Sequence, residues 1–582
     1  MPKSTQLALL LTLTLSLTFS LTSDLDHATP GLFADEAVYA GMTQSLARDF
    51  DLYYSPDDLE RLFMHFPAGP TGIILKQNEE ASRIVYAKPF LYPLITAPLY
   101  LLFRLNGLIL LNALCWWICL YCVSTAWHHS PRGFLFGFVS LFLSAFAPYA
   151  LWMHPEMFTA MLASAGTLFW KRAAEAPDAA SSGRNAGCMA AFFTLAATIK
   201  PQLLIFPALG ALQFALRRQP RTIIRLVAVC VITILTVMAA GFLLTGELNA
   251  YSGNRKIFVT QFPFEDPAAH FDRFGNAWST DNAKMYLQPA VIIWNCFFYM
   301  FGRFTGIVPY FFPSAVVVVL LFIRRFRSSI GFFLLSGVLI ISLVQIILIP
   351  TNYHGGGGAL ANRYFLMLVP ALLIALARPP SLRITLATAV IAGLFAGPFL
   401  IRPFASSFHP GDHAMKGIYM RLPAEWTLVD SLPIFDPSHS RVQFDGIEAH
   451  FLFLDRNIYG KEADGFWVLG DSHAEFFMKS PRSLSSALFR IGEPLTDVRV
   501  RIRQGRFRDE FTCATGVLLD RDIPLSGHPF IDIYGRQFWI YHFSITVAGG
   551  GIPKYRTDST DSRYLGIFIR PRDLHSTEQI FR

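Results

Sequence analysis

Apolar runs of helix length recur along the first 400 positions and alternate with short clusters of basic residues. A run of about 20 apolar residues is long enough to cross the hydrocarbon core of a bilayer as a helix. Runs of this kind cover residues 5–23, 106–127, 305–323 and 384–401, and a shorter predicted span covers 157–170. Two proline-containing runs, 89–104 and 289–304, predict helices that lie at the membrane interface. The pattern therefore predicts a mainly α polytopic membrane protein.

The basic clusters predict the orientation of these helices. Each cluster is separated from the next by two apolar runs, and the turn between those runs is poor in basic charge or broken by proline. Because basic loops remain on the cytoplasmic side, the alternation predicts about eleven spans with the N-terminus inside and the C-terminus outside. We expect a multi-pass protein of the bacterial inner membrane with two large external loops, 24–88 and 246–288. Residues 5–23 are expected to be an uncleaved anchor, because no small-residue cleavage site follows them.

The pattern changes after the last apolar run. Residues 402–582 contain short runs of alternating character, such as Val498–Ile502 and Phe538–Thr546, divided by Gly, Pro and Asp. Such runs are typical of a β-sandwich or jelly roll. We therefore expect two domains: a transmembrane domain over 1–401 and an extracytoplasmic all-β sandwich over 402–582. The sandwich is expected either to bind a glycan or partner protein, or to cap the mouth of the site.

Composition supports a membrane protein and removes other classes. Hydrophobic residues make up 53% of the chain and charged residues only 15%, against about 25% charged in soluble domains. The formal charge of +8 is carried by clusters between apolar runs, so no nucleic-acid partner is expected. The seven cysteines are scattered and predict neither a disulfide framework nor a paired metal motif.

An acidic pair, Asp35 and Glu36, begins a helical pattern just after the first apolar run. Val38, Met42 and Leu46 follow at helical spacing, which predicts one apolar face. Asp35 occupies the expected N-cap position, so the pair is open to a structural interpretation, as the cap of a surface helix. Its position on the external side of a membrane protein favours a functional one.

Further polar residues fall on the predicted external side. They are Lys88, His154, Glu156, Lys200, Gln202, Arg303, His354 and Arg363. A carboxylate can act as general base toward an acceptor, and a nearby lysine or arginine can hold a phosphate as it leaves. This combination predicts transfer of a group from a lipid phosphate. Lys88, Arg303 and Arg363 are equally open to explanation as basic residues that reach lipid headgroups from span ends.

The loop Thr351–Arg363 contains four consecutive glycines. Such a loop can approach a ligand closely or move as a gate, and it can equally be a flexible turn between two spans.

Five segments in order resemble the GT-C glycosyltransferases, especially the branch of the protein O-mannosyltransferases and the lipid A aminoarabinose transferases. The sequence FADEAVYAGMTQSLARD is similar to the first external loop of that branch, with its acidic pair followed by a tyrosine, here Tyr39. AKPFLYPLITAPLYLLF at 87–103 resembles its Lys-Pro-Pro-Leu segment. The others are MHPEMFTAMLASAGTLFW at 153–170, TIKPQLLIFPALGAL at 198–212 and ANRYFLMLVPALL at 361–373. Glu156 stands where the family usually has Asp, and the glycine of the Thr-Lys-Gly-Pro turn is missing.

The resemblance implies a membrane glycosyltransferase that moves a sugar from a polyprenyl-phosphate donor, with inversion, to a glycan, lipid or protein acceptor. It implies catalytic roles for Asp35, Glu36 and Glu156. Lys88, Arg363 and Arg303 are expected to bind the donor phosphate. Tyr39, His154, Lys200 and His354 are expected on the acceptor side. A divalent metal held by Glu156 and His154 is an open option.

Two other functions stay open at this point. The first is a non-catalytic transporter or scaffold for lipid-linked glycans, in which neutralising Asp35 has no effect. The second comes from Gly470-Asp471-Ser472-His473, which matches the first block of SGNH esterases. That motif requires an α/β domain, and Asp573 and His575 lack the usual spacing of the partner pair. A turn between sandwich strands accounts for it better.

Overall fold

The computed structural model describes residues 1–25, 31–77, 83–248, 251, 253–259, 261–264, 267–277, 286–434, 442–532 and 534–577. The predicted external loops 24–88 and 246–288 lie partly outside this described set. The chain forms two compact units. The first unit comprises 1–281, 305–345 and 358–408, and the second comprises 282–304, 346–357 and 409–582. The second unit therefore includes two segments that the sequence pattern assigned to the transmembrane domain.

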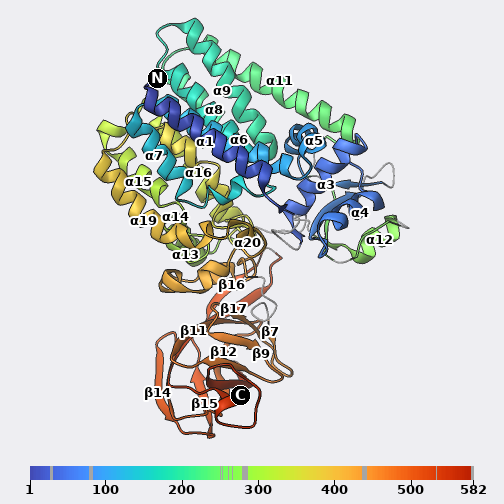
Figure 1. The fold of residues 1–582 in the computed structure, drawn as a ribbon, viewed down its shortest axis with the longest axis vertical. Helices are drawn as coiled ribbons and strands as arrows, with labels where there is room; N and C mark the ends of the chain where they lie inside the picture. The colour runs from blue at the N-terminus through green and yellow to red at the C-terminus, as the bar shows by residue number, and fades with distance from the viewer. Residues whose placement is uncertain are drawn as a thin grey trace. The chain divides into compact units, whose positions relative to one another are not determined.

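Helices form where the apolar runs predicted them (Figure 1). Five described helices are long and apolar enough to cross a membrane: α1 Lys3–Thr22, α6 Asn106–Ala126, α11 Pro220–Thr245, α16 Gly331–Leu348 and α19 Leu382–Leu400. Shorter apolar helices are α5 Leu91–Phe103, α7 Pro131–Phe142, α10 Ile205–Leu216, α13 Pro289–Phe301, α15 Phe312–Phe322 and α18 Val369–Ile374. The number of spans and their orientation stay predictions.

Two further helices, α8 Glu156–Ala174 and α9 Ala179–Ile199, form the centre of the first unit. α8 packs against α6 and α9, and α9 packs along α11 (Figure 1). Small residues allow the close approach of α8 and α9, as at Gly166, where a Cβ would lie 2.8 Å from the Phe193 ring. Such small-residue contacts are typical of helix pairs in membranes. The N-terminus of α8 and the C-terminus of α9 carry Glu156 and Lys200.

The acidic pair begins helix α3, Asp35–Arg48, as predicted, but its surroundings differ from the prediction. Every residue from Asp35 to Ala47 is buried, so the interpretation as a surface helix is wrong. The N-cap is Ala34, at φ +50°, and no side chain caps the helix. The prediction that Asp35 is the N-cap is therefore wrong, because its carboxylate is held by ion pairs across the fold instead.

The rest of the first external segment forms α4 Pro56–His65 and short strands. β1 Leu32–Phe33 pairs with β2 Pro70–Thr71. β3 Ile73–Gln77 and β4 Ile84–Tyr86 form a second sheet with two strands of the second predicted loop, β5 Arg255–Phe258 and β6 Asn276–Ala277. β5 comes from the second predicted loop and pairs antiparallel with β3, from Ile73↔Phe258 to Lys76↔Arg255. The two predicted external loops therefore fold together. α12 Pro267–Phe274 lies between β5 and β6.

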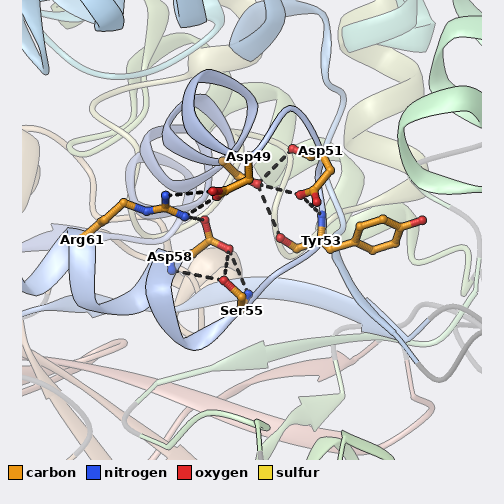
Figure 2. A network of polar contacts seen from close by, with 7 residues as sticks. Asp49, Asp51, Tyr53, Ser55, Asp58 and Arg61 are labelled. Atoms are coloured by element: carbon orange, nitrogen blue, oxygen red, sulfur yellow. Dashed lines mark hydrogen bonds and ion pairs between the residues drawn. The ribbon is translucent and has the colours of Figure 1, made fainter.

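A polar network joins the end of α3 to α4 (Figure 2). Arg61 pairs with Asp49 and, at 2.7 Å, with Asp58. Ser55 and Asp58 form a capping box, in which the Ser55 N–H donates to the Asp58 carboxylate at 2.9 Å. Because a capping box satisfies two otherwise unpaired backbone N–H groups, it stabilises the first turn of α4. The network fixes the helix that carries Asp35 to its neighbour.

The second unit contains the two predicted sheets. One has the order β15-β12-β18-β10-β9 and the other β14-β13-β17-β11-β8-β7, with β16 added to β17. The strands are β7 Val442–Gln443, β8 His450–Phe453, β9 Ile458–Lys461, β10 Phe466–Leu469, β11 Ser472–Ser480, β12 Leu484–Gly492, β13 Val498–Gln504, β14 Phe507–Cys513, β15 Leu518–Pro524, β16 His528–Ile531, β17 Gln537–Ala548 and β18 Leu565–Ser576.

Side chains of both sheets share one core. Phe466 of one sheet lies 5.5 Å from Phe476 of the other, and Phe489 lies 5.6 Å from Phe543, measured between ring centroids. The alternating runs at 498–502 and 538–546 lie within β13 and β17. Residues 409–434 do not belong to these sheets and form short helical turns at Asp412–Met415, Gly417–Arg421 and Trp426–Leu428.

Candidate active site

Asp35 lies at the centre of a cluster of charged residues in the first unit. One carboxylate oxygen, Oδ1, is 2.7 Å from Lys88 Nζ. The other, Oδ2, accepts a hydrogen bond from Arg363 Nη1 at 2.5 Å. Lys88 lies between β4 and α5, and Arg363 begins α17, Arg363–Leu366. Three segments that are far apart in the sequence thus bring one acid and two cations together.

Glu156 forms the second half of this cluster. Its carboxylate lies 3.3 Å from His154 Nδ1 and 3.3 Å from Lys200 Nζ. Arg363 Nη1 is 4.0 Å from Glu156 Oε1, so this arginine lies between the two carboxylates. Both acids are almost fully buried, with 5% of Asp35 and none of Glu156 exposed. Buried charges persist only when paired, and each acid here has at least two basic neighbours.

Glu36 faces different partners. Its carboxylate accepts a hydrogen bond from the Met153 N–H at 3.0 Å and another from the Ser407 hydroxyl. Glu36 thereby fixes the turn that carries His154 to helix α3. Glu36 thus positions the turn that carries His154, and the catalytic role that the sequence predicted for it stays a prediction.

The cations determine the charge state of Asp35. Burial by itself would raise the pKa of the Asp35 carboxyl, but Lys88, Arg363, His154 and Lys200 together hold that pKa well below its usual value. Burial lowers the pKa of Lys88, and Asp35 opposes this change. Asp35 is therefore an ionised carboxylate whose charge is neutralised by neighbouring cations.

The predicted metal option can be tested against the same geometry. Asp35, His154 and Glu156 could each offer a ligand atom, and these atoms lie within 4.8 Å of one another. Both Asp35 oxygens, however, contact Lys88 or Arg363, and Glu156 contacts Lys200. Three cations thus surround two carboxylates. Because a divalent ion would have to displace positive charges that are already paired, the residues do not fit a metal and instead fit an added anion.

A cavity of about 290 Å³ lies beside this cluster in the first unit. Its polar lining includes Lys76, Lys88, Glu247 and Tyr251. Its apolar lining comes from the start of α5, from α9 and the turn that follows it, and from α11, and includes Phe90, Leu91, Leu204, Ile234, Val237 and Met238. The outer side of α11 exposes large apolar residues, among them Val231, Leu235, Phe242 and Leu243. Lys88 therefore pairs with Asp35 and also lines a cavity that is bounded on one side by the apolar helix α11.

Other predicted residues have different positions. The Tyr39 ring is buried and meets the Tyr92 ring edge-on at 5.7 Å. Arg303 and His354 belong to the second unit. There Arg303 donates to the Glu475 carboxylate at 2.8 Å, and His354 is buried beside Tyr353.

The esterase motif lies in the sandwich. Asp471 is in the turn before β11, at φ +49°, and Ser472 is the first residue of that strand. The Ser472 hydroxyl donates to the Leu469 carbonyl at 2.6 Å. His575 lies in β18, opposite Ser486. The motif is thus a turn between strands, and the strand–turn–helix context of an esterase nucleophile is missing at Ser472.

Sequence reasoning missed three residues of the cavity. Lys76 in β3 forms an ion pair with Glu247, which follows α11. Tyr251 donates its hydroxyl to the Ile199 carbonyl at 2.8 Å, at the end of α9. A lysine within the apolar run IILKQ was the available signal for Lys76, but its partner lies 171 positions away.

Comparison with known proteins gives structural neighbours only. No protein-family model and no curated protein matches the chain. ArnT from Cupriavidus metallidurans bound to undecaprenyl phosphate is 14% identical with a TM-score of 0.40, over 72% of this chain and 69% of that one. Arabinosyltransferase EmbB from Mycobacterium smegmatis is 11% identical with a TM-score of 0.31, over 100% of this chain and 65% of that one.

Proposed function

We propose that this protein is an integral-membrane glycosyltransferase that moves a sugar from a polyprenyl-phosphate donor to an acceptor on the external face of the membrane. The observation that carries the proposal is the double contact of Lys88. Its ammonium group pairs with Asp35 and also lines an apolar cavity beside the lipid-facing helix α11. A lipid phosphate has the two parts that such a site would bind, an anionic head and an apolar chain.

We assign the donor's position from these two kinds of contact, charged and apolar. Its phosphate contacts Lys88, with Arg363 as the second cation, and its first isoprene units occupy the cavity along α11. Charge-assisted hydrogen bonds to a phosphate are stronger than neutral ones. Arg303 has no part in this assignment, because its guanidinium is paired with Glu475.

Asp35 is the proposed general base. In the transfer step, an oxygen or nitrogen of the acceptor forms a bond to the anomeric carbon and loses its proton to Asp35. The bond from the anomeric carbon to the phosphate oxygen breaks, and its electron pair leaves with the polyprenyl phosphate. A single displacement of this kind inverts the anomeric carbon. Lys88 and Arg363 stabilise the charge that develops on the leaving phosphate.

Donor binding also changes the strength of this base. With both cations in contact, the lowered pKa makes Asp35 a weak base, whereas a useful base has a pKa nearer the working pH. A phosphate that attracts Lys88 and Arg363 weakens their hold on Asp35 and raises its pKa. The base is therefore strengthened when the donor is present.

Glu156, with His154 and Lys200, is proposed to orient the acceptor, and Tyr39 contributes to the wall near Asp35. No step uses a metal, because the carboxylate oxygens are occupied by cations. The bacterial inner membrane is the proposed location, with the N-terminus cytoplasmic and the second unit's sandwich on the external side. The donor's sugar and the acceptor's identity are left to experiment.

The test is transfer from a panel of radiolabelled polyprenyl-phosphate sugars by membranes that contain the protein. Asp35→Asn is compared with wild type and with Asp57→Asn, which changes an exposed acid in the first turn of α4. Transfer that disappears only in Asp35→Asn supports the proposal. Transfer that survives in Asp35→Asn would show that Asp35 is not the general base. No transfer from any donor by wild-type protein favours a non-catalytic transporter or scaffold for lipid-linked glycans.

A further inference from the structure

The hairpin β13–β14 of the second unit carries five arginines: Arg499, Arg501, Arg503, Arg506 and Arg508. We call these residues the arginine face. Along β13, Val498, Val500 and Ile502 are buried in the sandwich core, and the arginines between them are exposed. Because successive side chains of a strand point to opposite faces, Arg499, Arg501 and Arg503 form one outward row. Arg499 is wide open to solvent, with 70% of its side chain exposed.

The second strand adds to this row. Arg508 lies directly opposite Arg503, and Glu510 lies opposite Arg501. Gly505 and Arg506 form the two-residue turn of the hairpin, and the Gly505 φ of +57° suits glycine at the first position of such a turn. The row therefore ends in three arginines close together, Arg503, Arg506 and Arg508.

Acidic partners are scarce on this face. Glu510 pairs with Arg501 at 2.9 Å and lies 4.0 Å from Arg499. Asp509 is in register with the buried Ile502, and its carboxylate is 3.9 Å from Arg521 of β15. In the described part of the chain, no acidic side chain pairs with the three arginines at the turn.

The other sheet of the sandwich shows the contrast. There Arg490 pairs with Asp520 at 2.7 Å, and Arg570 pairs with Asp464 at 2.6 Å. Like charges directly opposite each other on neighbouring strands are destabilising. The Arg503–Arg508 pair thus works against the stability of the hairpin, so its presence is better explained by an external anion than by folding.

We propose that the arginine face binds a linear acidic polysaccharide. Arginine presents a fork that matches a carboxylate or phosphate in a two-bonded geometry. Alternate residues on a strand are about 6.8 Å apart, so the row offers repeated cations to an extended chain with repeated acids. Ser544, on the neighbouring strand β17, lies opposite Arg503 and adds a hydroxyl group that can bond to a sugar hydroxyl. Thr546 lies opposite Arg501, and its hydroxyl is hydrogen-bonded to His473 Nδ1 at 3.0 Å.

The same face is less suited to a bilayer surface. Peripheral membrane binding by a basic surface is strengthened by apolar side chains that enter the headgroup region. Here Phe507 and Phe511 pack against the sandwich core instead. An extended acidic glycan fits a row of cations flanked by hydroxyls, and it needs no apolar insertion.

The test uses the full-length protein in neutral detergent, immobilised for a binding assay. Polygalacturonate is the probe, and its fully methyl-esterified form is the uncharged control. The variant Arg503→Gln/Arg508→Gln is compared with wild type and with Arg490→Gln, an arginine of the other sheet. We expect binding of the acid form only, weakening as salt rises because exposed charges are screened. The double variant should bind about tenfold or more weakly, and Arg490→Gln should bind as wild type does.

Folding is checked by thermal unfolding. Since the double variant removes a like-charge pair, its Tm should equal or exceed that of wild type. Arg506→Gln, in the turn, is a second variant that changes no cross-strand pair and should also weaken binding. Equal binding of the esterified polymer, or unchanged binding by both arginine variants, overturns the proposal. Failure to bind polygalacturonate together with arginine-dependent binding to phosphatidylglycerol vesicles also overturns it, in favour of a lipid surface. None of these outcomes depends on the transfer reaction.

Discussion

Replacing Lys88 by methionine tests the link between the cavity and the acidic cluster. Methionine keeps an unbranched apolar stem in the cavity and removes only the ammonium group that contacts Asp35 at 2.7 Å. Two consequences follow if the proposed mechanism is correct. The donor phosphate loses one cationic partner, and Asp35 loses the neighbour that contributes most to lowering its pKa.

The first consequence, weaker binding of the donor phosphate, can be given a magnitude. A hydrogen bond to a charged group contributes about 1.5–3 kcal/mol. Since about 1.4 kcal/mol corresponds to a factor of ten in rate, kcat/KM for the lipid donor should fall by about 10- to 150-fold.

The second consequence is a change in the pKa of Asp35, and its direction follows from the charge that is removed. In the free wild-type protein the lowered pKa keeps Asp35 ionised, so kcat/KM, which reports the free enzyme, should fall through loss of the base only at strongly acidic pH. Without Lys88 the pKa of Asp35 rises. The acidic limb of the pH–rate profile therefore moves to higher pH, and transfer is lost earlier as the pH falls.

The assay is the initial rate of transfer in proteoliposomes from about pH 3 to pH 8, a range that brackets the ordinary pKa of an aspartate carboxyl. Lys256→Met is the matched control, because Lys256 lies in the second external loop, on a strand that pairs with β3 of the first, but its ammonium group pairs with Asp272 at 2.5 Å. A fall in kcat/KM of less than about threefold would remove Lys88 from donor binding. A large fall with an unmoved acidic limb would refute the coupling between Lys88 and Asp35.

Three further predictions follow from the geometry. Treatment with EDTA should leave transfer unchanged, since cations already occupy the carboxylates; a loss that Mg²⁺ or Mn²⁺ restores would contradict this. Gly241→Leu should raise KM for the lipid donor with little change in kcat. A Cβ added at Gly241 would lie 3.2 Å from the Phe90 ring in the cavity wall, so a leucine side chain would narrow the cavity. An unchanged KM would mean that the lipid binds elsewhere. Ser55→Ala should lower the free energy of unfolding by about 1 kcal/mol, seen as a lower Tm in detergent, whereas an unchanged Tm would mean that the capping box adds nothing.

The helices and the sandwich could be predicted because their signals are local. A run of 20 apolar residues or an alternating run such as 498–502 needs no partner to be recognised. The division of the chain into two units could not be predicted from such local runs. Residues 282–304 are apolar like a span, yet they belong to the second unit, where Gln288 exchanges two hydrogen bonds with Ile531. That contact joins positions 243 residues apart.

The site was predicted in part. Asp35, Lys88, Glu156, Lys200 and Arg363 were all singled out by residue type and by the side of the membrane, and the structure brings them together. Their pairing was not predictable. The sequence pattern assigned Asp35 a cap and Arg363 a span end, because local rules cannot include an ion pair between residues 328 positions apart.

Residues outside that cluster show what the sequence pattern misinterpreted or missed. Glu36 looked like a second catalytic acid because it follows Asp35, but successive helix residues point about 100° apart, and this one turns to Met153 and Ser407. Lys76 and Glu247 carried no motif at all. Their pairing depends on the packing of β3 beside the end of α11.

The central claim is that a polyprenyl phosphate lies in the cavity with its phosphate on Lys88. The most direct measurement is photo-crosslinking of the full-length protein in detergent with a polyprenyl phosphate that carries a diazirine on an early isoprene unit, followed by mass spectrometry. The account predicts crosslinks to the cavity side of α11, at Ile234, Val237 or Met238. Excess unlabelled polyprenyl phosphate should abolish them, excess polyprenol should not, and Lys88→Met should weaken them. Crosslinks elsewhere in the chain, or equal competition by polyprenol, would contradict the claim.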